Sequence, residues 1–249
     1  MVTWGDPPSG GDSSAVKAEL TGVTQVYSSD FAFAALKSDG TVVTWGKPNF
    51  GGDSSAVKAE LTGVTQVYSA GAAFAALKSD GTVVTWGYPD DGGDSSAVKP
   101  SLTGVARVYS TAGAFAALKS DGTVVTWGTA GFGGDSSAAK PSLTGVTEIY
   151  STDSAFAALK SDGTVVTWGD PVWGGDSSAV KVELTGITQV YSAHYAFAAV
   201  KSDGTVVTWG DPNGGGDSSA VKAELTGITQ VYSTDSAFAA LKSDGTVVT

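Results

Sequence analysis

Histidine and cysteine, which most often carry nucleophilic and metal chemistry, are almost absent from this sequence. His194 is the only histidine among 249 residues, and there is no cysteine. A Ser-His-Asp triad needs a histidine beside its serine, and zinc sites need several histidine or cysteine ligands. We interpret His194 as a surface contact beside Tyr195. The composition therefore predicts a protein that is not an enzyme, with no catalytic residue, no metal ligand and no cofactor.

The motif Gly-Gly-Asp-Ser-Ser, found for example at residues 51–55, could in principle hold an ion. Glycine frees backbone N–H groups and aspartate supplies a hard oxygen, as in phosphate and calcium sites. One carboxylate per loop is too few for a calcium site, however, and Asp and Ser side chains commonly stabilise turns. We therefore expect turns at these positions.

The tryptophans show how the chain is organised. Six of them recur at a constant spacing of 41 residues, which indicates a tandem repeat with tryptophan as its packing anchor. These structural residues are Trp4, Trp45, Trp86, Trp127, Trp168 and Trp209. They divide the chain into the units 4–44, 45–85, 86–126, 127–167, 168–208 and 209–249, which we expect to form one domain.

Each unit contains three short runs rich in β-branched and aromatic residues, such as 187–192, 197–201 and 205–210. Runs of this length and composition predict strands, and Asp203-Gly204 predicts a tight hairpin turn between the last two. A weaker segment, 179–184, predicts a fourth strand at the edge of the sheet. The strong runs are apolar on both sides, so we expect each sheet to be covered on both faces.

These features favour a closed ring over an open array. An open array needs polar capping units at its ends, whereas a ring needs none. The sequence opens with Val2-Thr3-Trp4-Gly5 and finishes with Val247-Val248-Thr249, which are parts of one strand motif. We predict an all-β fold, a β-propeller of six 41-residue blades with about four antiparallel strands each, closed by pairing of the N- and C-terminal strand segments.

The two terminal segments would compete for the same positions in that shared strand. Near-identical blades also favour exchange between chains, so a homo-oligomer formed by strand or blade exchange is an alternative to a closed monomer.

The core Phe-Ala-Ala-Leu-Lys-Ser-Asp-Gly-Thr-Val-Val-Thr-Trp-Gly, preceded by Leu-Thr-Gly-Val and Val-Tyr, recurs with small changes along the chain. This pattern resembles the repeats of the regulator-of-chromosome-condensation family, which includes β-lactamase-inhibiting propellers. The resemblance implies a β-propeller that acts by protein–protein contact, either as an enzyme inhibitor or in guanine-nucleotide exchange and chromatin binding. Propellers of that family usually have seven blades and more divergent repeats, so the uniformity here favours recent duplication or engineering.

Charge and hydropathy exclude several classes of partner. The net charge is −11, from 25 acidic and 14 basic residues, which disfavours binding to nucleic acid. No apolar run approaches the roughly 18 residues of a membrane span. The start of the sequence has no signal-peptide pattern, so we expect a soluble chain whose compartment is unknown.

The copies differ from one another in two stretches, one after Trp-Gly and one after Tyr-Ser. Because successive strands alternate in direction, both stretches should lie at the same edge of each sheet. Aromatic and acidic residues there are typical of a contact surface. The candidate ligand-binding residues are Phe31, Phe50, Tyr88, Asp90, Asp91, Phe132, Trp173, His194 and Tyr195. Alternatively, these loops vary freely and their aromatic rings pack on neighbouring loops.

Together these observations predict a non-enzymatic binding scaffold that presents variable loops to a protein partner, with inhibition of an enzyme as one version of that function. A second hypothesis is an engineered or recently amplified repeat propeller without a native ligand. A third is a multivalent lectin, although a lectin should repeat its site and the candidate contacts differ between copies.

Overall fold

The computed structural model describes all 249 residues as six three-stranded antiparallel sheets joined by short helical turns. The chain divides into two compact units, described separately below. The first contains Met1–Asp121 and Val125–Ala130, and the second contains Gly122–Val124 and Gly131–Thr249.

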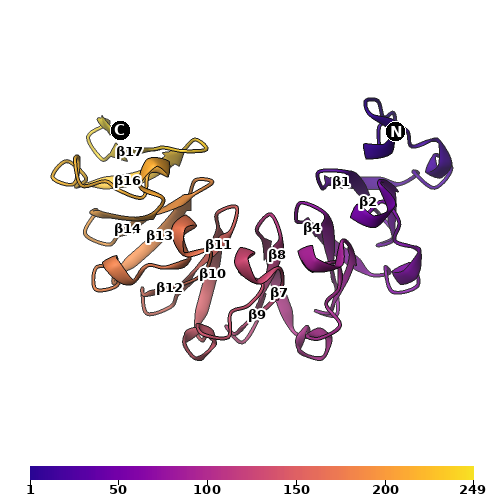
Figure 1. Cartoon of the computed structure of the whole chain (residues 1–249), viewed down its shortest axis with the longest axis horizontal. Coiled ribbons are helices and arrows are strands. Elements are labelled where there is room, and N and C mark those ends of the chain that lie inside the picture. The colour runs from indigo at the N-terminus through magenta and orange to yellow at the C-terminus, as the bar shows by residue number, and fades with distance from the viewer. The chain divides into compact units, whose positions relative to one another are not determined.

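The first unit contains three sheets that follow one another in chain order (Figure 1). Their strands are β1 (Val23–Ser28), β2 (Ala32–Lys37), β3 (Val42–Gly46), β4 (Val64–Ser69), β5 (Ala73–Lys78), β6 (Val83–Gly87), β7 (Val105–Ser110), β8 (Ala114–Lys119) and β9 (Val124–Gly128). The helical turns are η1 (Pro7–Ser9), η2 (Ser14–Val16), η3 (Pro48–Phe50), η4 (Ser55–Val57), η5 (Pro89–Gly93) and η6 (Lys99–Ser101). A further turn, η7 (Ala130–Phe132), spans the boundary between the two units.

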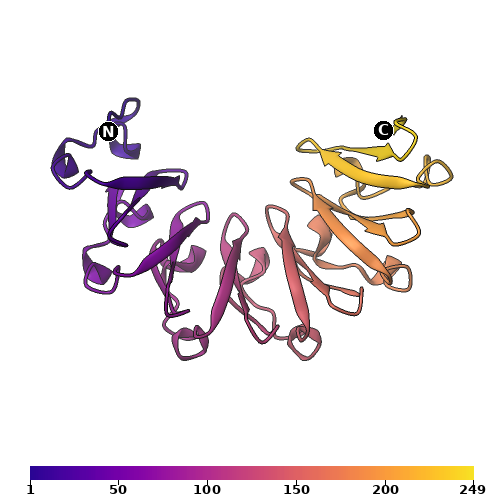
Figure 2. The same ribbon diagram turned by 180° about the vertical axis from the view of Figure 1, so that it is seen from behind.

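The second unit repeats this arrangement with three further sheets, visible from the other side in Figure 2. Its strands are β10 (Val146–Ser151), β11 (Ala155–Lys160), β12 (Val165–Gly169), β13 (Ile187–Ser192), β14 (Ala196–Lys201), β15 (Val206–Gly210), β16 (Ile228–Ser233), β17 (Phe238–Lys242) and β18 (Val247–Val248). Its helical turns are η8 (Lys140–Ser142), η9 (Pro171–Gly175), η10 (Ser178–Val180) and η11 (Pro212–Gly214).

The all-β fold of six repeated blades is confirmed, with each blade a simple meander. In the second blade β5 pairs with both β4 and β6, and Phe74 lies opposite Trp86 in the register. The predicted hairpin turn follows β5, where Gly81 has a φ of 75° and Asp80 accepts hydrogen bonds from Thr82. Glycine adopts this left-handed conformation without steric cost, which explains the repeated Asp-Gly.

Consecutive blades pack face to face, as the apolar strands predicted. In the first unit, Ala32, Ala34, Leu36 and Val42 of the first blade form one buried cluster with residues of the second blade. We call this the trailing face of a blade, because it is turned to the next blade in the chain. The residues of the second blade in this cluster define the leading face: Leu61, Val64, Val67, Phe74, Ala76, Val84 and Trp86. Small alanines on the middle strands allow the sheets to approach closely.

The fourth strand of each blade was wrongly predicted. In the fifth blade, the expected edge segment begins within η10 and continues as turns. Asp176 accepts a hydrogen bond from the backbone N–H of Ser178, and the N–H of Leu184 bonds to the carbonyl of Val180. Local hydrogen bonds from Asp to the backbone compete with strand pairing, and here they favour a compact turn.

The chain ends do not display the predicted shared strand. Residues 2–5 form no strand, and β18 pairs only with β17, through Leu241 and Ala240. Ring closure by pairing of the terminal segments therefore stays a prediction, as does the single domain.

Candidate functional site

The two variable stretches of each blade lie together, as predicted from strand direction. In the first blade the backbone N–H of Lys47, just after β3, donates to the carbonyl of Phe31, just before β2, at 2.9 Å. The same bond joins Tyr88 to Ala72 and Asp170 to Ser154. We call the edge formed by these paired loops the loop edge; the Ser-Asp-Gly turns occupy the opposite edge.

Backbone hydrogen bonds also connect the loop edge from blade to blade within each unit. In the first unit, Asp30 N–H donates to Gly71 and Gly71 N–H donates to Ala112, at 2.9 and 2.7 Å. In the second unit, Asp153 bonds in the same way to His194 and His194 to Asp235, at 3.0 Å each. The loops are therefore held in a regular row, which fixes the positions of the variable side chains.

Three predicted residues meet in the first unit. Phe31 packs edge-on against Phe50 with ring centroids 5.0 Å apart, and Phe50 stacks with Tyr88 at 5.7 Å. Lys47 lies over the Phe50 ring, with its Nζ 4.2 Å from the centroid. We call Phe31, Lys47, Phe50 and Tyr88 the first aromatic cluster. Phe31 and Tyr88 remain 37% and 39% exposed, so the cluster presents apolar surface to solvent.

Acidic groups lie on the same unit's loops. The Asp91 carboxyl has a raised pKa, mainly because burial disfavours its charged form and secondarily because Asp90 and Asp30 are negative. A hydrogen bond with the Thr129 side chain opposes that shift. The hydroxyl of Thr129 also donates to the carbonyl of Asp90 at 2.9 Å. Asp90 and Asp91 thus belong to one local acidic group, as their neighbouring positions predicted.

A second group forms in the second unit. Trp173 packs edge-on against Tyr195 at 4.8 Å, and Tyr195 against His194 at 5.9 Å. The imidazole lies between two carboxylates, with Nδ1 3.5 Å from Asp153 and Nε2 3.3 Å from Asp235. We call Trp173, His194 and Tyr195 the second aromatic cluster. This arrangement suits recognition of a planar or cationic group, because aromatic faces and carboxylates both attract cations.

The remaining predicted residue, Phe132, lies half-buried at the end of η7. Sequence reasoning missed Lys47, whose ammonium covers two rings, and Val172, which is 61% exposed beside Trp173. Both stand in the variable stretch after Trp-Gly, so variation between copies was the available signal. Part of the alternative interpretation is also correct, because the rings do pack on neighbouring loops.

Five of the six repeat tryptophans are packing anchors, at 4% to 5% exposure. The prediction that Trp4 is a packing anchor was wrong, because its side chain is 85% exposed. The other five each stack on a phenylalanine of their own sheet, for example Trp86 on Phe74 at 5.2 Å. Residues 2–5 belong to no sheet, so Trp4 has no such ring beneath it.

The structure contains no group of three or more His, Cys, Asp or Glu side chains arranged to hold a metal ion. The Gly-Gly-Asp-Ser-Ser segments form turns, in which Asp53 accepts a hydrogen bond from the N–H of Ser55 at 2.8 Å.

The helical turns are all short, and none has the length and apolar character needed to cross a membrane.

No protein-family model matches the sequence, and no curated protein matches it. Among solved structures, the chain is similar to human WBSCR16, with 19% identity, 76% of this chain covered and a TM-score of 0.48. It is also similar to yeast RCC1 (Prp20) bound to Kap60, with 14% identity over 94% of this chain and 71% of that chain, at a TM-score of 0.49. The computationally designed Ika8 protein matches with 18% identity over 90% of this chain and 69% of that chain, at a TM-score of 0.43.

The chain spans 61% of the length of the WBSCR16 chain. An RCC1 protein and a computationally designed protein are thus both among the similar structures.

Proposed function

We propose that this chain is a non-enzymatic binding protein whose loop edge recognises a protein partner. The observation that carries the proposal is the gathering of variable aromatic residues into two clusters. Phe31, Phe50 and Tyr88 stand in three different repeat units, yet Phe50 contacts the rings of both other residues. The scaffold does not require them, because other copies carry small or polar residues at the equivalent positions.

The chemistry of the clusters favours a partner with basic and apolar side chains. Partly exposed aromatic rings are typical anchors of protein interfaces, and nearby carboxylates attract cationic groups. Asp90 and Asp91 supply that charge in the first unit, and Asp153 and Asp235 supply it around His194 in the second. The net charge of −11 favours the same kind of partner through long-range attraction. Inhibition of an enzyme is one form that such binding can take.

Near-identity of the copies favours a second candidate, an amplified or engineered scaffold without a ligand. The two candidates differ in what happens when the variable aromatics are replaced. We would therefore substitute each ring by the residue that another copy carries at that position: Phe31→Ala, Phe50→Ser, Tyr88→Thr, Trp173→Gly and Tyr195→Ser. These replacements suit the local backbone, because the other blades already fold with them.

The immobilised chain and this five-residue variant would be used to capture proteins from varied cell lysates, with affinities measured for each captured protein. A control variant, Lys78→Ala with Lys37→Ala, alters the opposite edge of two blades. We expect a partner whose affinity falls about tenfold or more in the loop variant and is unchanged in the control, since loss of one interface anchor costs about 2 kcal/mol. Equal capture by all three proteins, or none, would favour the scaffold without a ligand.

A further inference from the structure

The joint between consecutive blades has the same apolar packing throughout each unit, although its ion pair is missing between the fourth and fifth blades, where Ser142 takes the glutamate position. A trailing face of Ala, Ala, Leu and Val packs against a leading face whose central residues are a Val and a Phe, such as Val67 at 1% and Phe74 at 0% exposure. Two polar contacts accompany this packing. The N–H of Val64 donates to the carbonyl of Gly40 at 2.9 Å, and Lys58 pairs with Glu19 at 3.1 Å.

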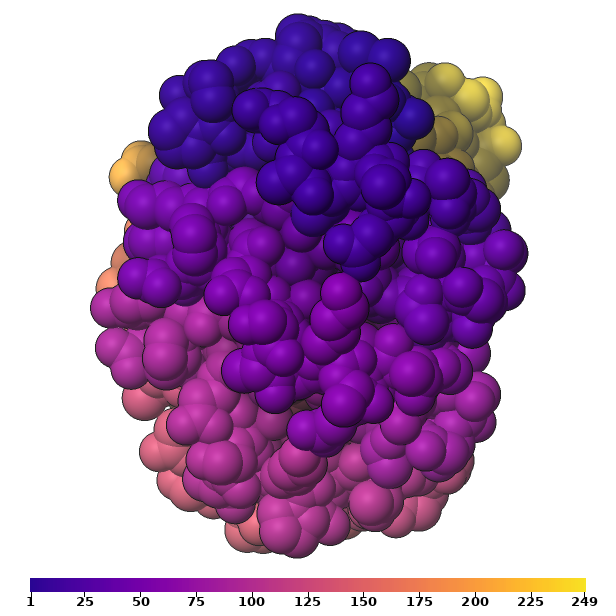
Figure 3. All heavy atoms as spheres, turned by 90° about the vertical axis from the view of Figure 1, so that its right-hand side faces the viewer, coloured from indigo at the N-terminus to yellow at the C-terminus, as the bar shows by residue number.

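Within the first unit, no blade packs against the leading face of the first blade. Val26 stands at the position of Val67 in the repeat but is 46% exposed, and Phe33 is only half-buried. In the space-filling view the N-terminal segment and first blade, coloured indigo, lie on the surface that faces the viewer (Figure 3). Trp4, at 85% exposure, belongs to the same end of the first unit.

Within the second unit, no blade packs against the trailing face of the sixth blade either. Tyr232 is 53% exposed, whereas the equivalent Tyr68 of the second blade is half-buried. Ala239 and Leu241 are half-buried, while Ala75 and Leu77 at the same positions are buried. The two open faces are therefore the two complementary halves of the joint that recurs inside the chain.

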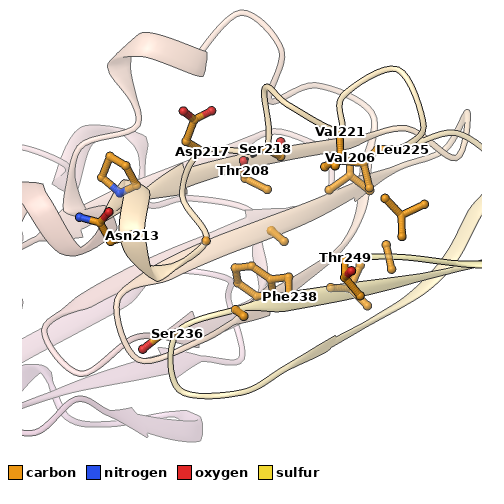
Figure 4. Close-up of a pocket in the computed structure, with 17 residues that line it drawn as sticks. Val206, Thr208, Asn213, Asp217, Ser218, Val221, Leu225, Ser236, Phe238 and Thr249 are labelled. Atoms are coloured by element: carbon orange, nitrogen blue, oxygen red, sulfur yellow. Dashed lines mark hydrogen bonds between the residues drawn. The ribbon is translucent and has the colours of Figure 1, made fainter.

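The sixth blade also lacks a stacked tryptophan. In the second blade the indole of Trp86 stacks on Phe74 and lies beside Gly51. A Cβ added to Gly51 would be 3.8 Å from the Nε1 atom of Trp86. At the equivalent Gly215 the three atoms nearest to such a Cβ belong to Phe238 and Ala237, and none is from a tryptophan. A cavity of about 250 Å³ lies at this place, and its lining includes Gly215, Phe238 and Thr249. Figure 4 shows the Phe238 ring between the segment that carries Asn213 and the chain end at Thr249.

We propose that two copies of this chain associate head to tail, with the leading face of one copy's first blade packed on the trailing face of the other copy's sixth blade. The incoming Trp4 stacks on Phe238 in the cavity, and its indole N–H donates to the carbonyl of Gly215. Trp86 makes the corresponding bond to Gly51 within the chain, at 3.0 Å. A second copy is the occupant because each face lacks a neighbouring blade within its own unit and matches the face that the other unit presents.

The polar contacts of the joint specify the same register. Lys17 of the incoming copy corresponds to Lys58, and Glu224 of the receiving copy corresponds to Glu19, so the two meet as an ion pair. The N–H of the incoming Val23 corresponds to that of Val64 and reaches the carbonyl of Gly245. These contacts form only when a leading face meets a trailing face, which is a heterologous arrangement. Two leading faces or two trailing faces packed together would not bring these pairs of residues into contact.

Seating Trp4 requires an exchange of strand ends. Val247–Thr249 of the receiving copy occupy the repeat positions that Met1–Thr3 of the incoming copy would take. β18 spans only two residues, whereas β6 spans five, so it is the weakest strand to displace. The N-terminal segment of the incoming copy already makes a hydrogen bond that the inner repeats make. The Thr3 hydroxyl bonds to Ser13, as Thr44 bonds to Ser54, at 2.9 Å in both cases.

Two variants, each blocking one face, test the proposal by sedimentation equilibrium. Val26→Arg places a charge on the leading face, and Ala239→Arg places one on the trailing face. We expect the mass of the 249-residue chain to rise with concentration above 24.9 kDa, whereas each variant alone stays at 24.9 kDa. A mixture of the two variants should form a species of twice that mass and none larger, because only one pair of intact faces remains.

A third variant controls for the added charge. Val182, 87% exposed in the fifth blade, is replaced by arginine and should leave association unchanged. Trp4→Ala should raise the dissociation constant about tenfold or more, as expected for loss of an aromatic anchor. Circular dichroism of each variant verifies folding. A wild-type mass of 24.9 kDa at every concentration, association of either face variant alone, a monomeric mixture, or unchanged association of Trp4→Ala would each overturn the proposal.

Discussion

The indole N–H of Trp86 donates to the carbonyl oxygen of Gly51 across 3.0 Å, joining the last strand of one blade to the loop that follows the preceding blade. The same bond recurs for Trp45, Trp127, Trp168 and Trp209. It lies in a buried environment, where an unsatisfied carbonyl would be costly. This relationship explains why the tryptophan recurs, whereas the positive φ of Gly51 and the nearby Phe74 ring explain the glycine. The two residues lead to the first two predictions.

Replacing Trp86 by phenylalanine should lower the free energy of unfolding by about 2 kcal/mol or more. The substitution leaves the Gly51 carbonyl without its donor and removes part of a buried ring. Urea unfolding followed by circular dichroism measures the loss. Trp173→Phe, at a half-exposed loop position, serves as the control and should cost much less. Equal losses would show that the buried hydrogen bond does not contribute to stability.

Replacing Gly51 by alanine should also lower the free energy of unfolding by about 2 kcal/mol. Gly51 has a φ of 100°, and an added Cβ would lie 2.5 Å from the Phe74 ring. Backbone strain and overpacking each cost about 1 to 2 kcal/mol in such positions. Gly131→Ala is the matched control, since its Cβ would meet nothing within 4 Å and its φ is not positive. A similar loss in both variants would contradict this explanation.

Acid should destabilise the protein through the Asp-Gly turns. The hydroxyl and backbone N–H of a threonine donate to each turn carboxylate and hold its pKa below the ordinary 3.8, at Asp39, Asp80, Asp162, Asp203 and Asp244. A carboxyl whose pKa is lowered by folding stabilises the folded state above its unfolded pKa, and that contribution is lost as pH falls through the folded pKa. The melting temperature should therefore fall as pH drops below about 4.

Replacing these five aspartates by asparagine should reduce that acid dependence of the melting temperature. A control in which the five glutamates are replaced by glutamine changes the net charge by the same amount without touching the turns. If both variants showed the same pH profile as the wild type, the turn carboxylates would not be responsible.

Asp91→Asn should act in the opposite sense and raise the melting temperature at pH 7. Burial, with the negative Asp90 and Asp30 nearby, raises the pKa of Asp91, so its charged form is penalised in the folded state. The protonated Asp91 carboxyl makes its full contribution to stability below the unfolded pKa. That contribution is lost as the pH rises through the folded pKa. The gain from Asp91→Asn should therefore disappear near pH 3. A gain that persisted there would point to a cause other than charge.

The periodicity of the sequence identified the blades and their three strong strands, because apolar runs bounded by Asp-Gly turns leave little conformational choice. It also placed Phe31 and Phe50 at the same edge, since strand direction follows from strand order. It failed at the segment 179–184, where local hydrogen bonds of Asp176 outweigh a weak strand preference. Propensity alone does not include such side-chain competition for the backbone.

The sequence by itself determined the repeat, the strand order and the edge on which the copies vary, because these depend on residue spacing along the chain. Only the tertiary structure decided that Phe50 contacts Tyr88, that Lys47 covers the Phe50 ring and that His194 lies between Asp153 and Asp235. It also separated Trp4, at 85% exposure, from Trp45, at 5%, although both stand in nearly the same sequence context. The physical reason is that contact and burial depend on which blade packs against a residue, and that neighbour is set by the fold rather than by the local motif.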